Sequence, residues 1–488
     1  MVSKQDLFEL IKTLNKNEKR YFRMFASLQK GAKKYLLLFD EISGQKAYNE
    51  LKIKKSLNDK NLIRHFAFNK NYLKQMILKS LVLYNANNIS DIKIQNMITT
   101  AKILFSKALF RQYFRTLDTA KKLAMKNERF GYLLEILDME KYIIKKEVLH
   151  YKKSDEIYTT AFNSINKLNN YFKYSKITSS LIYNYRTTGI RREIKHDKEV
   201  KKLLSAGLMN SPINALSARS LENYYRIKEI ENIAKGDNQE VYNAIRKRRE
   251  VLIKYPDAFK NHIIDFNIDT LTGLTDVCIK LNRLNEAEEY LNMIRSVTKP
   301  GNADIEDISV NSSFYKFQIV LKRKAVVEIT EYIKTIEQLL IKYENKLLID
   351  SELYIRFCIV KAYMLIKNYD KALSAINSML IHKLIHKRED LRFYLLMLNL
   401  IVHYELKNYN LLNHLIRSTQ RFLSKQKRLY KTESLVLKFL KHLPELKQDD
   451  NLYLTSFIKK LSILKKQSYE QNAFEYYDFL EWAKTLKL

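Results

Sequence analysis

The sequence predicts an all-α chain built from helical hairpins that stack on one another. Apolar residues recur at spacings of three and four nearly throughout the 488 residues, which is the period of an amphipathic helix. Glycine and proline are scarce, with 8 and 4 copies, so a fold rich in strands and tight turns is disfavoured. The same interruption, Lys-Asn-Tyr, divides apolar runs at residues 367–369 and 407–409. Its recurrence indicates a turn inside a repeating unit.

The first segments predict short amphipathic helices. Ser3 and Asn15 stand where helix N-caps are expected, and Glu18 follows Asn15 at the spacing of a capping box. Apolar residues at helical spacing come after each cap, and a longer helix is expected at about 60–86. We therefore predict an N-terminal helical region at residues 1–90.

From about residue 94 the expected helices are roughly 15 to 22 residues long and are separated by short polar stretches. Pro212, Pro256 and Pro300 are each 44 residues apart. Proline collects just beyond helix ends because it lacks a backbone N–H and disfavours helix in the residue before it. The equal spacing therefore predicts a repeating unit of about 44 residues. Weaker stops near the middle of such units, which would be the turns of the hairpins, lie at 236–238, 282–285, 367–369 and 407–409.

Around these turns the residues resemble the tetratricopeptide repeat (TPR). That family places an aromatic residue late in the first helix of a hairpin, a tyrosine at the turn and a small residue three positions later. Tyr363, Tyr369 and Ala372 have this order and spacing, and Leu284 with Ala287 matches the turn and small positions of an earlier unit. The opening of the chain also resembles a group of uncharacterised bacterial TPR-like proteins, a similarity that implies no activity.

The resemblance implies a right-handed α-α superhelix of stacked helical hairpins, with repeats of about 40–44 residues that are longer than is usual in the family. The array is expected at residues 91–465, and residues 466–488, which hold the only tryptophan, Trp482, are expected to form a capping helix. Two positions depart from the family pattern. Leu412 stands where a small residue is expected, and Val360 replaces glycine or alanine.

The net charge of +34 is unevenly distributed. Residues 1–250 carry +25, residues 251–350 carry −2 and residues 351–488 carry +11. Such a chain can attract nucleic acid, anionic lipid or acidic proteins, or can simply have a lysine-rich solvated surface. The only two cysteines are 80 residues apart, which is neither a disulfide framework nor a zinc motif. Because no run of eighteen apolar residues occurs either, we expect a soluble, cytoplasmic protein without a membrane span.

No motif indicates a reaction centre, a metal site or a cofactor site. No two glycines are closer than 13 residues, which excludes phosphate-binding glycine loops. His382 and His386 have the spacing of a metal pair on a helix, but their lysine and arginine neighbours favour surface histidines. Cys278 is expected to be a buried, unreactive thiol. The carboxylates of one expected helix, which could share a proton if buried, are expected on a solvated face; they are Asp265, Asp269 and Asp276.

The leading functional hypothesis is a non-enzymatic scaffold that binds a peptide or helix of a partner protein along the solenoid surface. In the TPR family that surface is lined by residues of the first helices, and exposed aromatic residues there would dominate binding. The corresponding residues in two consecutive units are Tyr354, Phe357, Lys361, Met364, Tyr394, Met397, Ile401 and Tyr404.

The alternative is a basic nucleic-acid-binding or gene-regulatory protein. The run Arg246, Lys247, Arg248 and Arg249 could neutralise phosphates. Four consecutive residues sweep more than one helical turn, so at least one of these cations must lie near the packed side and find a partner there. An enzyme whose site is assembled from distant helices is a third, weaker hypothesis.

Overall fold

The structure is a computed structural model, and all statements below concern the residues that it describes. These are residues 5–28, 34–57, 59–86, 89–144, 151–188, 198–205, 207–297, 305–344, 347, 349–445 and 451–486. In these ranges every regular element is a helix and no strand occurs. The predicted all-α class is confirmed.

The chain divides into two compact units, each described here by itself. Unit 1 comprises Met1–Asn166, Asp257–Asn261 and Pro300–Ala303, and unit 2 comprises Lys167–Pro256, His262–Lys299 and Asp304–Leu488. The three segments expected from the sequence, 1–90, 91–465 and 466–488, concern the organisation of the repeats and stay a prediction.

Unit 1 begins with short helices around a small apolar core that includes Phe22, Phe39 and Ile77. The predicted capping box is confirmed, because the Glu18 N–H donates to Asn15 and the Asn15 N–H donates to Glu18, both at 2.9 Å. Ser3 lies outside the described residues. The helices are α1 (Asp6–Thr13), α2 (Lys16–Ser27), α3 (Lys34–Gly44), α4 (Glu50–Ser56), α5 (Lys60–Arg64), α6 (Phe66–Tyr84), α7 (Ser90–Ser106), α8 (Phe110–Lys126) and α9 (Phe130–Ile144).

The next helix, α10 (Tyr151–Thr188), contains residues of both units. The later helices, which belong to unit 2, are α11 (Lys198–Ser205), α12 (Ala218–Lys235), α13 (Asn238–Lys254), α14 (Ile263–Lys280), α15 (Leu284–Val297), α16 (Ile305–Arg323), α17 (Val326–Lys342), α18 (Ile349–Leu365), α19 (Tyr369–Leu380), α20 (Glu389–Glu405), α21 (Tyr409–Lys425), α22 (Lys431–His442), α23 (Asn451–Leu464), α24 (Asn472–Tyr476) and α25 (Phe479–Thr485). Short 3-10 helices are η1 (Pro212–Asn214), η2 (Pro256–His262), η3 (Ile385–Lys387) and η4 (Leu443–Glu445).

One turn geometry recurs between the helices of five hairpins in unit 2. In each turn a residue one or two positions after the end of the first helix has a positive φ, in the left-handed region that ends a helix. In the Lys-Asn-Tyr turns this residue is Lys367 or Lys407, and the N–H of the following asparagine donates to the carbonyl five residues back at 2.9 Å. The interruptions found in the sequence are therefore hairpin turns. The five positive-φ residues, 40 to 46 positions apart, are Gly236, Asn282, Lys324, Lys367 and Lys407.

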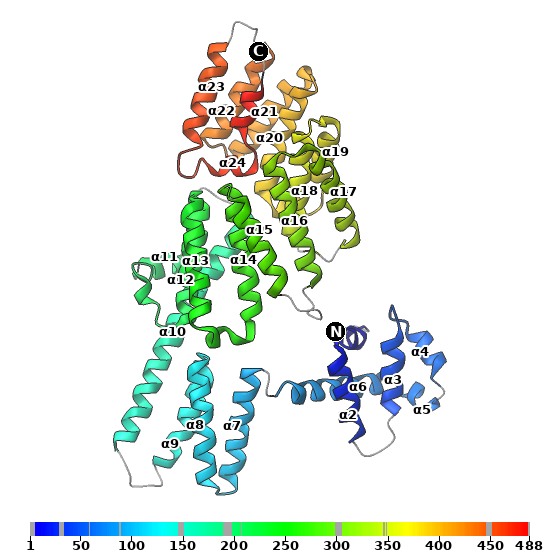
Figure 1. Cartoon of the computed structure of the whole chain (residues 1–488), viewed down its shortest axis with the longest axis vertical. Coiled ribbons are helices and arrows are strands. Elements are labelled where there is room, and N and C mark those ends of the chain that lie inside the picture. The colour runs from blue at the N-terminus through cyan, green and yellow to red at the C-terminus, as the bar shows by residue number, and fades with distance from the viewer. Residues whose placement is uncertain are drawn as a thin grey trace. The chain divides into compact units, whose positions relative to one another are not determined.

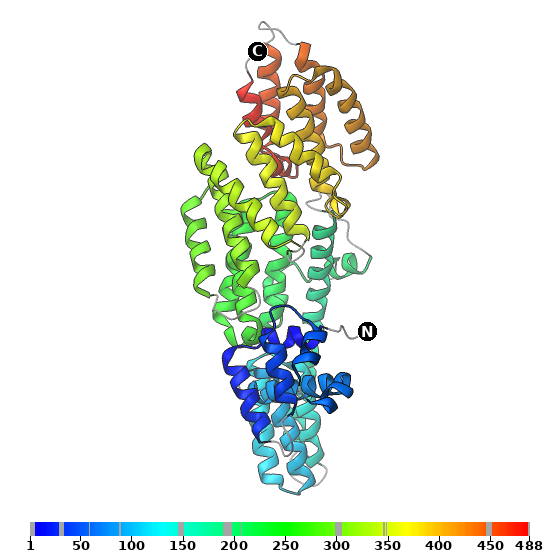
Figure 2. The same cartoon turned by 90° about the vertical axis from the view of Figure 1, so that its right-hand side faces the viewer.

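Successive hairpins of unit 2 pack against one another. The first helices form contacts in the order α14 with α16, α16 with α18, α18 with α20 and α20 with α22. Each second helix also packs on the next first helix, and Figures 1 and 2 show the resulting series of hairpins from green to orange. This stacking buries a continuous apolar core across neighbouring hairpins, as in a helical solenoid.

The residues that carried the TPR resemblance lie at this packing. Ala287 and Ala372, in the second helices of two hairpins, are fully buried, and so is Leu412 at the corresponding position of the next hairpin. Of the equally spaced prolines, Pro256 lies just beyond the end of α13, after the C-cap Tyr255, as expected. Pro212 instead opens η1 before α12, and Pro300 lies outside the described residues.

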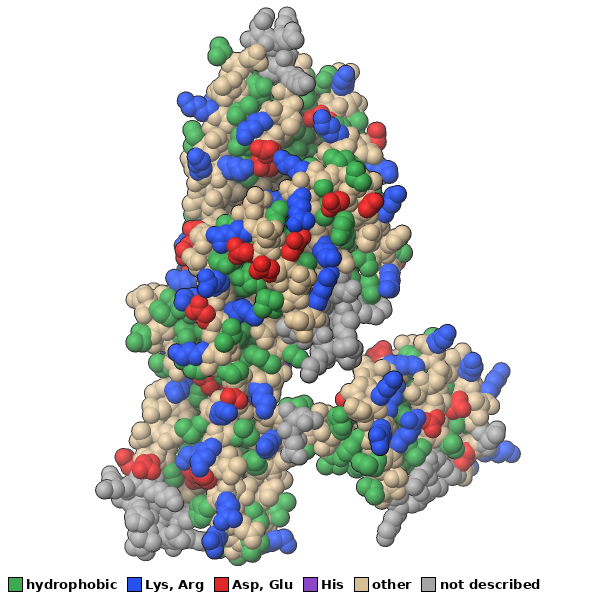
Figure 3. Space-filling model, in the orientation of Figure 1, with side chains coloured by type: hydrophobic (Ala, Val, Ile, Leu, Met, Phe, Trp, Pro, Cys, Tyr) green, Lys and Arg blue, Asp and Glu red, His purple; other side chains and the backbone are tan. Residues whose placement is uncertain are grey.

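Charged side chains are dispersed over the visible surface. On the face shown in Figure 3, Lys and Arg side chains are scattered over both units among fewer Asp and Glu side chains. None of the described helices has the combination of length and apolar character that crossing a lipid bilayer requires.

Candidate functional site

The candidate site of unit 2 is built by its C-terminal segment, residues 465–486, which folds back onto the hairpin α12–α13 (Figure 1). The Asn472 side chain donates to the carbonyl of Ala234 at 2.7 Å, and the Tyr469 N–H donates to the carbonyl of Lys235 at 2.9 Å. These carbonyls belong to the last turn of α12 and have no partner within the helix. The C-terminal segment therefore caps a helix that precedes it by more than 230 positions.

The turn at Gly236 allows this close approach. Gly236 has a φ of +80°, and a Cβ atom there would lie 2.5 Å from Cγ of Gln471 and 2.7 Å from Oδ1 of Asn472. Any larger residue would meet both a backbone strain and a clash. Glycine at this position thus serves the docking of the C-terminal segment as well as the hairpin turn.

A buried ion pair holds the middle of the C-terminal segment. Asp390, at the start of α20, pairs with Arg388 at 2.7 Å and accepts a hydrogen bond from the Tyr476 hydroxyl at 2.7 Å. The Tyr476 ring stacks on Tyr394 with ring centroids 4.0 Å apart. Burial opposes ionisation of Asp390, but the hydrogen bonds and charge of Arg388 outweigh it and hold the pKa of Asp390 below its usual value.

The far end of the segment is anchored by its tryptophan. The Trp482 indole N–H donates to Glu405 at 2.9 Å, and Phe479 is fully buried in the core of unit 2. The segment predicted as one capping helix is thus two short helices, α24 and α25.

Between the C-terminal segment and the first helices α14, α16 and α18 lies a cavity of about 620 Å³. Its apolar wall includes Met364, Leu365, Phe474 and Tyr477. We call it the lysine cavity, because six lysines line it: Lys280, Lys322, Lys324, Lys361, Lys367 and Lys465.

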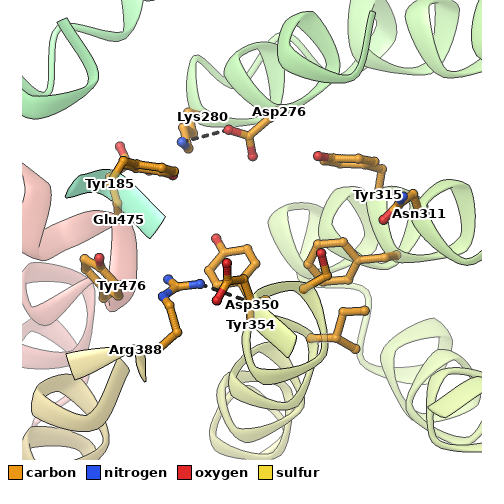
Figure 4. Close-up of a pocket in the computed structure, with 13 residues that line it drawn as sticks. Tyr185, Asp276, Lys280, Asn311, Tyr315, Asp350, Tyr354, Arg388, Glu475 and Tyr476 are labelled. Carbon is orange, nitrogen blue, oxygen red and sulfur yellow. Dashed lines mark hydrogen bonds and ion pairs between the residues drawn. The ribbon is translucent and has the colours of Figure 1, made fainter. Parts of the chain in front are cut away.

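An adjoining pocket of about 240 Å³, the polar pocket, shares Lys280, Tyr354 and Glu475 with the lysine cavity. Figure 4 shows side chains from α10, α14, α16, α18 and α24 surrounding an open centre. Lys280 pairs with Asp276 at 2.8 Å, and Arg388 donates to the backbone carbonyl of Asp350 at 3.3 Å. The pocket thus presents both cations and carboxylates.

The tyrosines of the polar pocket are hydrogen-bonding groups and not bases. Burial raises the pKa of Tyr315 and Tyr354 above the ordinary value, so their hydroxyls stay protonated at neutral pH. Cys358, which lines the lysine cavity, is 1% exposed, and burial raises the pKa of its thiol to about 11. A thiolate nucleophile is therefore disfavoured there.

The lysines of the cavity differ in how their charges are compensated. Lys324 pairs with Glu481 at 3.1 Å and Lys465 pairs with Asp478 at 2.7 Å. Among the described residues, no carboxylate lies within ion-pair distance of Lys322 or Lys361. Desolvation by the cavity walls lowers the pKa of Lys322, although its side chain is still open to solvent. The negative charge of Glu475 opposes this shift, and the smaller effect of the positive charge of Lys361 adds to it.

The residues predicted to form a partner-binding groove are mostly in the core. Phe357, Met397 and Ile401 have no exposed surface, and Met364 and Tyr394 are also buried. The expected exposed groove along α18 and α20 is therefore wrong for these five side chains. Neighbouring first helices, the paired second helices and the C-terminal segment cover the faces that the family pattern leaves open.

The other three predicted residues are partly exposed. Tyr354 and Lys361 line the lysine cavity. Tyr404 packs edge-on against Trp482. Of the buried residues, Met364 also reaches the cavity wall. A role of these residues in binding stays a prediction.

The predicted basic run is divided between surface and interior. Arg248 is 2% exposed and pairs with Glu222 at 2.7 Å and Glu229 at 2.6 Å. The expectation that one cation of the run lies on the packed side is thus confirmed. Arg246 and Lys247 are exposed, while Arg249 is partly buried and donates to Asn267. Arg248 is therefore not available to phosphates, which corrects that part of the nucleic-acid hypothesis.

Asp269 and Asp276, which were expected on a solvated face, are partly buried and form ion pairs. Asp269 pairs with Arg248 at 2.6 Å and with Arg226 at 3.2 Å, and Asp276 pairs with Lys280. Burial would raise the pKa of Asp269, but the two arginines lower it overall. Only Asp265 lies on an exposed face as expected.

The structure also places the two histidines and the cysteine that the sequence singled out. His382 and His386 lie in the connection between α19 and α20, so the premise of one shared helical face is wrong. Cys278 is fully buried, as predicted, and burial raises the pKa of its thiol to about 12.

Sequence reasoning missed the lysine cavity because its walls come from segments up to two hundred residues apart. Lys280, Lys322 and Lys465 belong to separate elements, and each is one of many lysines in a basic chain. The many aromatic residues at 474–482 could have indicated that this segment packs on a large apolar surface, because buried rings need such a surface.

Comparisons of the chain with models of protein families, with curated proteins and with solved structures found no match. The TPR resemblance is thus carried by the residues and by the hairpin stacking alone.

Proposed function

We propose that the chain is a non-enzymatic protein-interaction scaffold that binds an extended segment of a partner protein in the lysine cavity of unit 2. The observation that carries the proposal is the make-up of the cavity walls. Three consecutive first helices and the C-terminal segment supply cations beside aromatic and aliphatic side chains. The volume of about 620 Å³ lies within the usual range of ligand sites.

The finer architecture belongs to the same proposal. We infer a right-handed, TPR-like superhelix of the type seen in uncharacterised bacterial proteins. The inference is supported by hairpin turns that recur every 40 to 46 residues and by the buried alanines of the second helices. The cytoplasm is the compartment that we propose, on the composition of the chain.

The proposal is tested by blocking the cavity. Random peptides displayed on phage are selected on the immobilised full-length chain, and the enriched peptides are labelled for fluorescence anisotropy. Leu365, 37% exposed on the cavity wall, is replaced in Leu365→Trp, which fills space where the peptide would lie. We expect binding to weaken at least about tenfold, a change of about 1.4 kcal/mol.

The matched control is Ile381→Trp, because Ile381 is 83% exposed and does not line the lysine cavity. We expect this variant to bind like the wild type. Equal affinities of both variants and the wild type for every selected peptide would exclude the lysine cavity as the binding site.

The charge of the chain supports a second candidate, a basic nucleic-acid-binding or gene-regulatory protein. Residues 1–250 carry a net charge of +25, although the cations on the face in Figure 3 do not form one continuous patch. If this function holds, affinity for DNA or RNA falls steeply with added salt, with a slope that reports the number of phosphates engaged. An affinity that is independent of salt, or no binding at low salt, would argue against it.

A further inference from the structure

We infer that Lys322 and Lys361 form an anion-binding subsite within the lysine cavity and that its occupant is an acidic segment of a protein, in which carboxylates adjoin an aromatic or aliphatic side chain. The inference rests on the proposed function and names the chemistry of the partner. It begins from the charge balance of the cavity, which six lysines and three carboxylates of the described part of the chain line.

The three carboxylates of the cavity are already engaged. Glu475 accepts a hydrogen bond from the Asn238 side chain at 2.9 Å. Asp478 pairs with Lys465 and also accepts from the N–H of Glu481, which itself pairs with Lys324. These bonds fix the C-terminal segment in place. Glu475 keeps its charge and offsets part of the charge of Lys322, but no carboxylate among the described residues forms an ion pair with Lys322 or Lys361.

Lys322 and Lys361 are left as two like charges on neighbouring first helices, α16 and α18. Each raises the free energy of the other's charged form, and the surrounding protein screens them less than water would. A bound carboxylate would relieve this repulsion. Its attraction to both cations is stronger in the partly enclosed cavity than on an open surface.

The walls beside the two lysines indicate what else the ligand carries. Met364 and Leu365 lie on α18, and Phe474 and Tyr477 face the cavity from the C-terminal segment. An apolar side chain next to a carboxylate would fill this part of the cavity. Among the described residues, no arginine lines the lysine cavity, so they do not provide the planar, two-point recognition that often marks phosphate sites.

The test uses two synthetic peptides of the same shape, acetyl-EFELE-amide and the uncharged acetyl-QFQLQ-amide, with inorganic phosphate as a competitor. Binding to the full-length chain is measured by isothermal titration calorimetry. We expect the wild type to prefer the acidic peptide by at least about tenfold. The double variant Lys322→Met, Lys361→Met should lose most of this preference and still bind the uncharged peptide like the wild type.

The matched control is Lys334→Met, since Lys334 is exposed on α17 and outside the cavity. It removes a charge from the same stack of hairpins and should keep the preference of the wild type. Circular dichroism of each variant checks that the helices are retained, as expected for side chains outside the apolar core.

Three results would overturn the inference. They are an unchanged preference in the double variant, an equal loss in the control variant, and phosphate displacing the acidic peptide at equal concentration, which would assign the subsite to phosphate. Failure of the acidic peptide to bind the wild type would also overturn it. The proposed function would still stand if selected peptides of other composition remained sensitive to Leu365→Trp.

Discussion

At the scale of single residues, the buried Arg248 shows how a basic sequence uses one of its cations internally. Arg248, on α13, donates to Glu222 and Glu229 of α12 and to Asp269 of α14. Burial would lower the pKa of its guanidinium, but the three carboxylates raise it overall. The side chain therefore stays charged and ties three consecutive helices together.

We predict that Arg248→Met destabilises unit 2 by about 3–5 kcal/mol, because it leaves Glu222 buried without its counter-charge and leaves Glu229 paired with Arg226 alone. Urea unfolding followed by circular dichroism measures the change. Lys247→Met, which replaces the exposed neighbour, should change stability by less than about 0.5 kcal/mol. Equal effects of the two substitutions would show that the buried network contributes nothing of its own.

The buried Asp390 predicts a loss of stability in acid. Its pKa is lower in the folded chain than the ordinary value of about 3.9, so its contribution is fully present above about pH 4 and is lost as the pH falls through the folded pKa. Asp390→Asn should lower the free energy of unfolding at pH 7 by about 1.5–3 kcal/mol. The gap between variant and wild type should shrink below about pH 4.

Urea unfolding at a series of pH values measures this dependence. Asp370→Asn, on an exposed face of α19, is the control and should follow the wild type across the series. A gap between Asp390→Asn and the wild type that stays constant down to the acid limit would contradict the assigned role of Asp390.

At the scale of elements, the hairpin turns place ordinary residues in a conformation that suits glycine. Lys407 has a φ of 60°, and a side chain there costs roughly 1–2 kcal/mol relative to right-handed backbone. We predict that Lys407→Gly stabilises unit 2 by about 1 kcal/mol. Lys371→Gly, inside α19, should destabilise by a similar amount. Thermal unfolding compares the two, and the same sign for both would contradict this explanation of the turns.

At the turn of Gly236, replacing glycine by a larger residue should weaken the docking of the C-terminal segment. Gly236→Ala should strain the backbone and push away Gln471 and Asn472, which cap α12. We expect faster proteolysis within residues 465–486 and a changed fluorescence of Trp482, the only tryptophan. Gly131→Ala is the control, because Gly131 lies in α9 with nothing within 4 Å of an added Cβ. A Gly236→Ala chain with wild-type proteolysis would contradict the role of this turn.

At the scale of the whole molecule, the C-terminal segment connects parts of unit 2 that are distant in sequence. It bonds to α12, stacks on α20 and lines the lysine cavity beside α14, α16 and α18. Phe479, Trp482 and Ala483 are buried by these contacts. The segment thus completes the core of the array and also forms one wall of the candidate site.

We predict that removal of residues 465–488 exposes the ends of α12 and α20 and accelerates their amide hydrogen exchange, because buried side chains and capping bonds are lost. A synthetic peptide of residues 465–488, added in excess, should restore slow exchange. A scrambled peptide of the same composition is the control. Unchanged exchange in the truncated chain would show that the segment is not part of the cooperative core.

Local features of this protein could be predicted from the sequence where neighbouring residues decide them. The capping box at Asn15, the turns at Lys367 and Lys407 and the burial of Cys278 all follow from spacing over a few residues. The groove residues could not be predicted, because helical periodicity gives an apolar face but not which neighbour covers it. Phe357 and Ile401 have the pattern of ligand contacts and are core residues.

The sequence by itself determined the helical class, the hairpin turns and the excess of positive charge, since propensity, capping and composition act locally or as sums. Only the tertiary structure decided that Arg248 is internal, that residues 465–486 return to α12 and that Lys322 and Lys361 share a cavity. Such pairings depend on which surfaces exclude water together. That is a property of the folded chain and cannot be derived from the spacing of residues in its sequence.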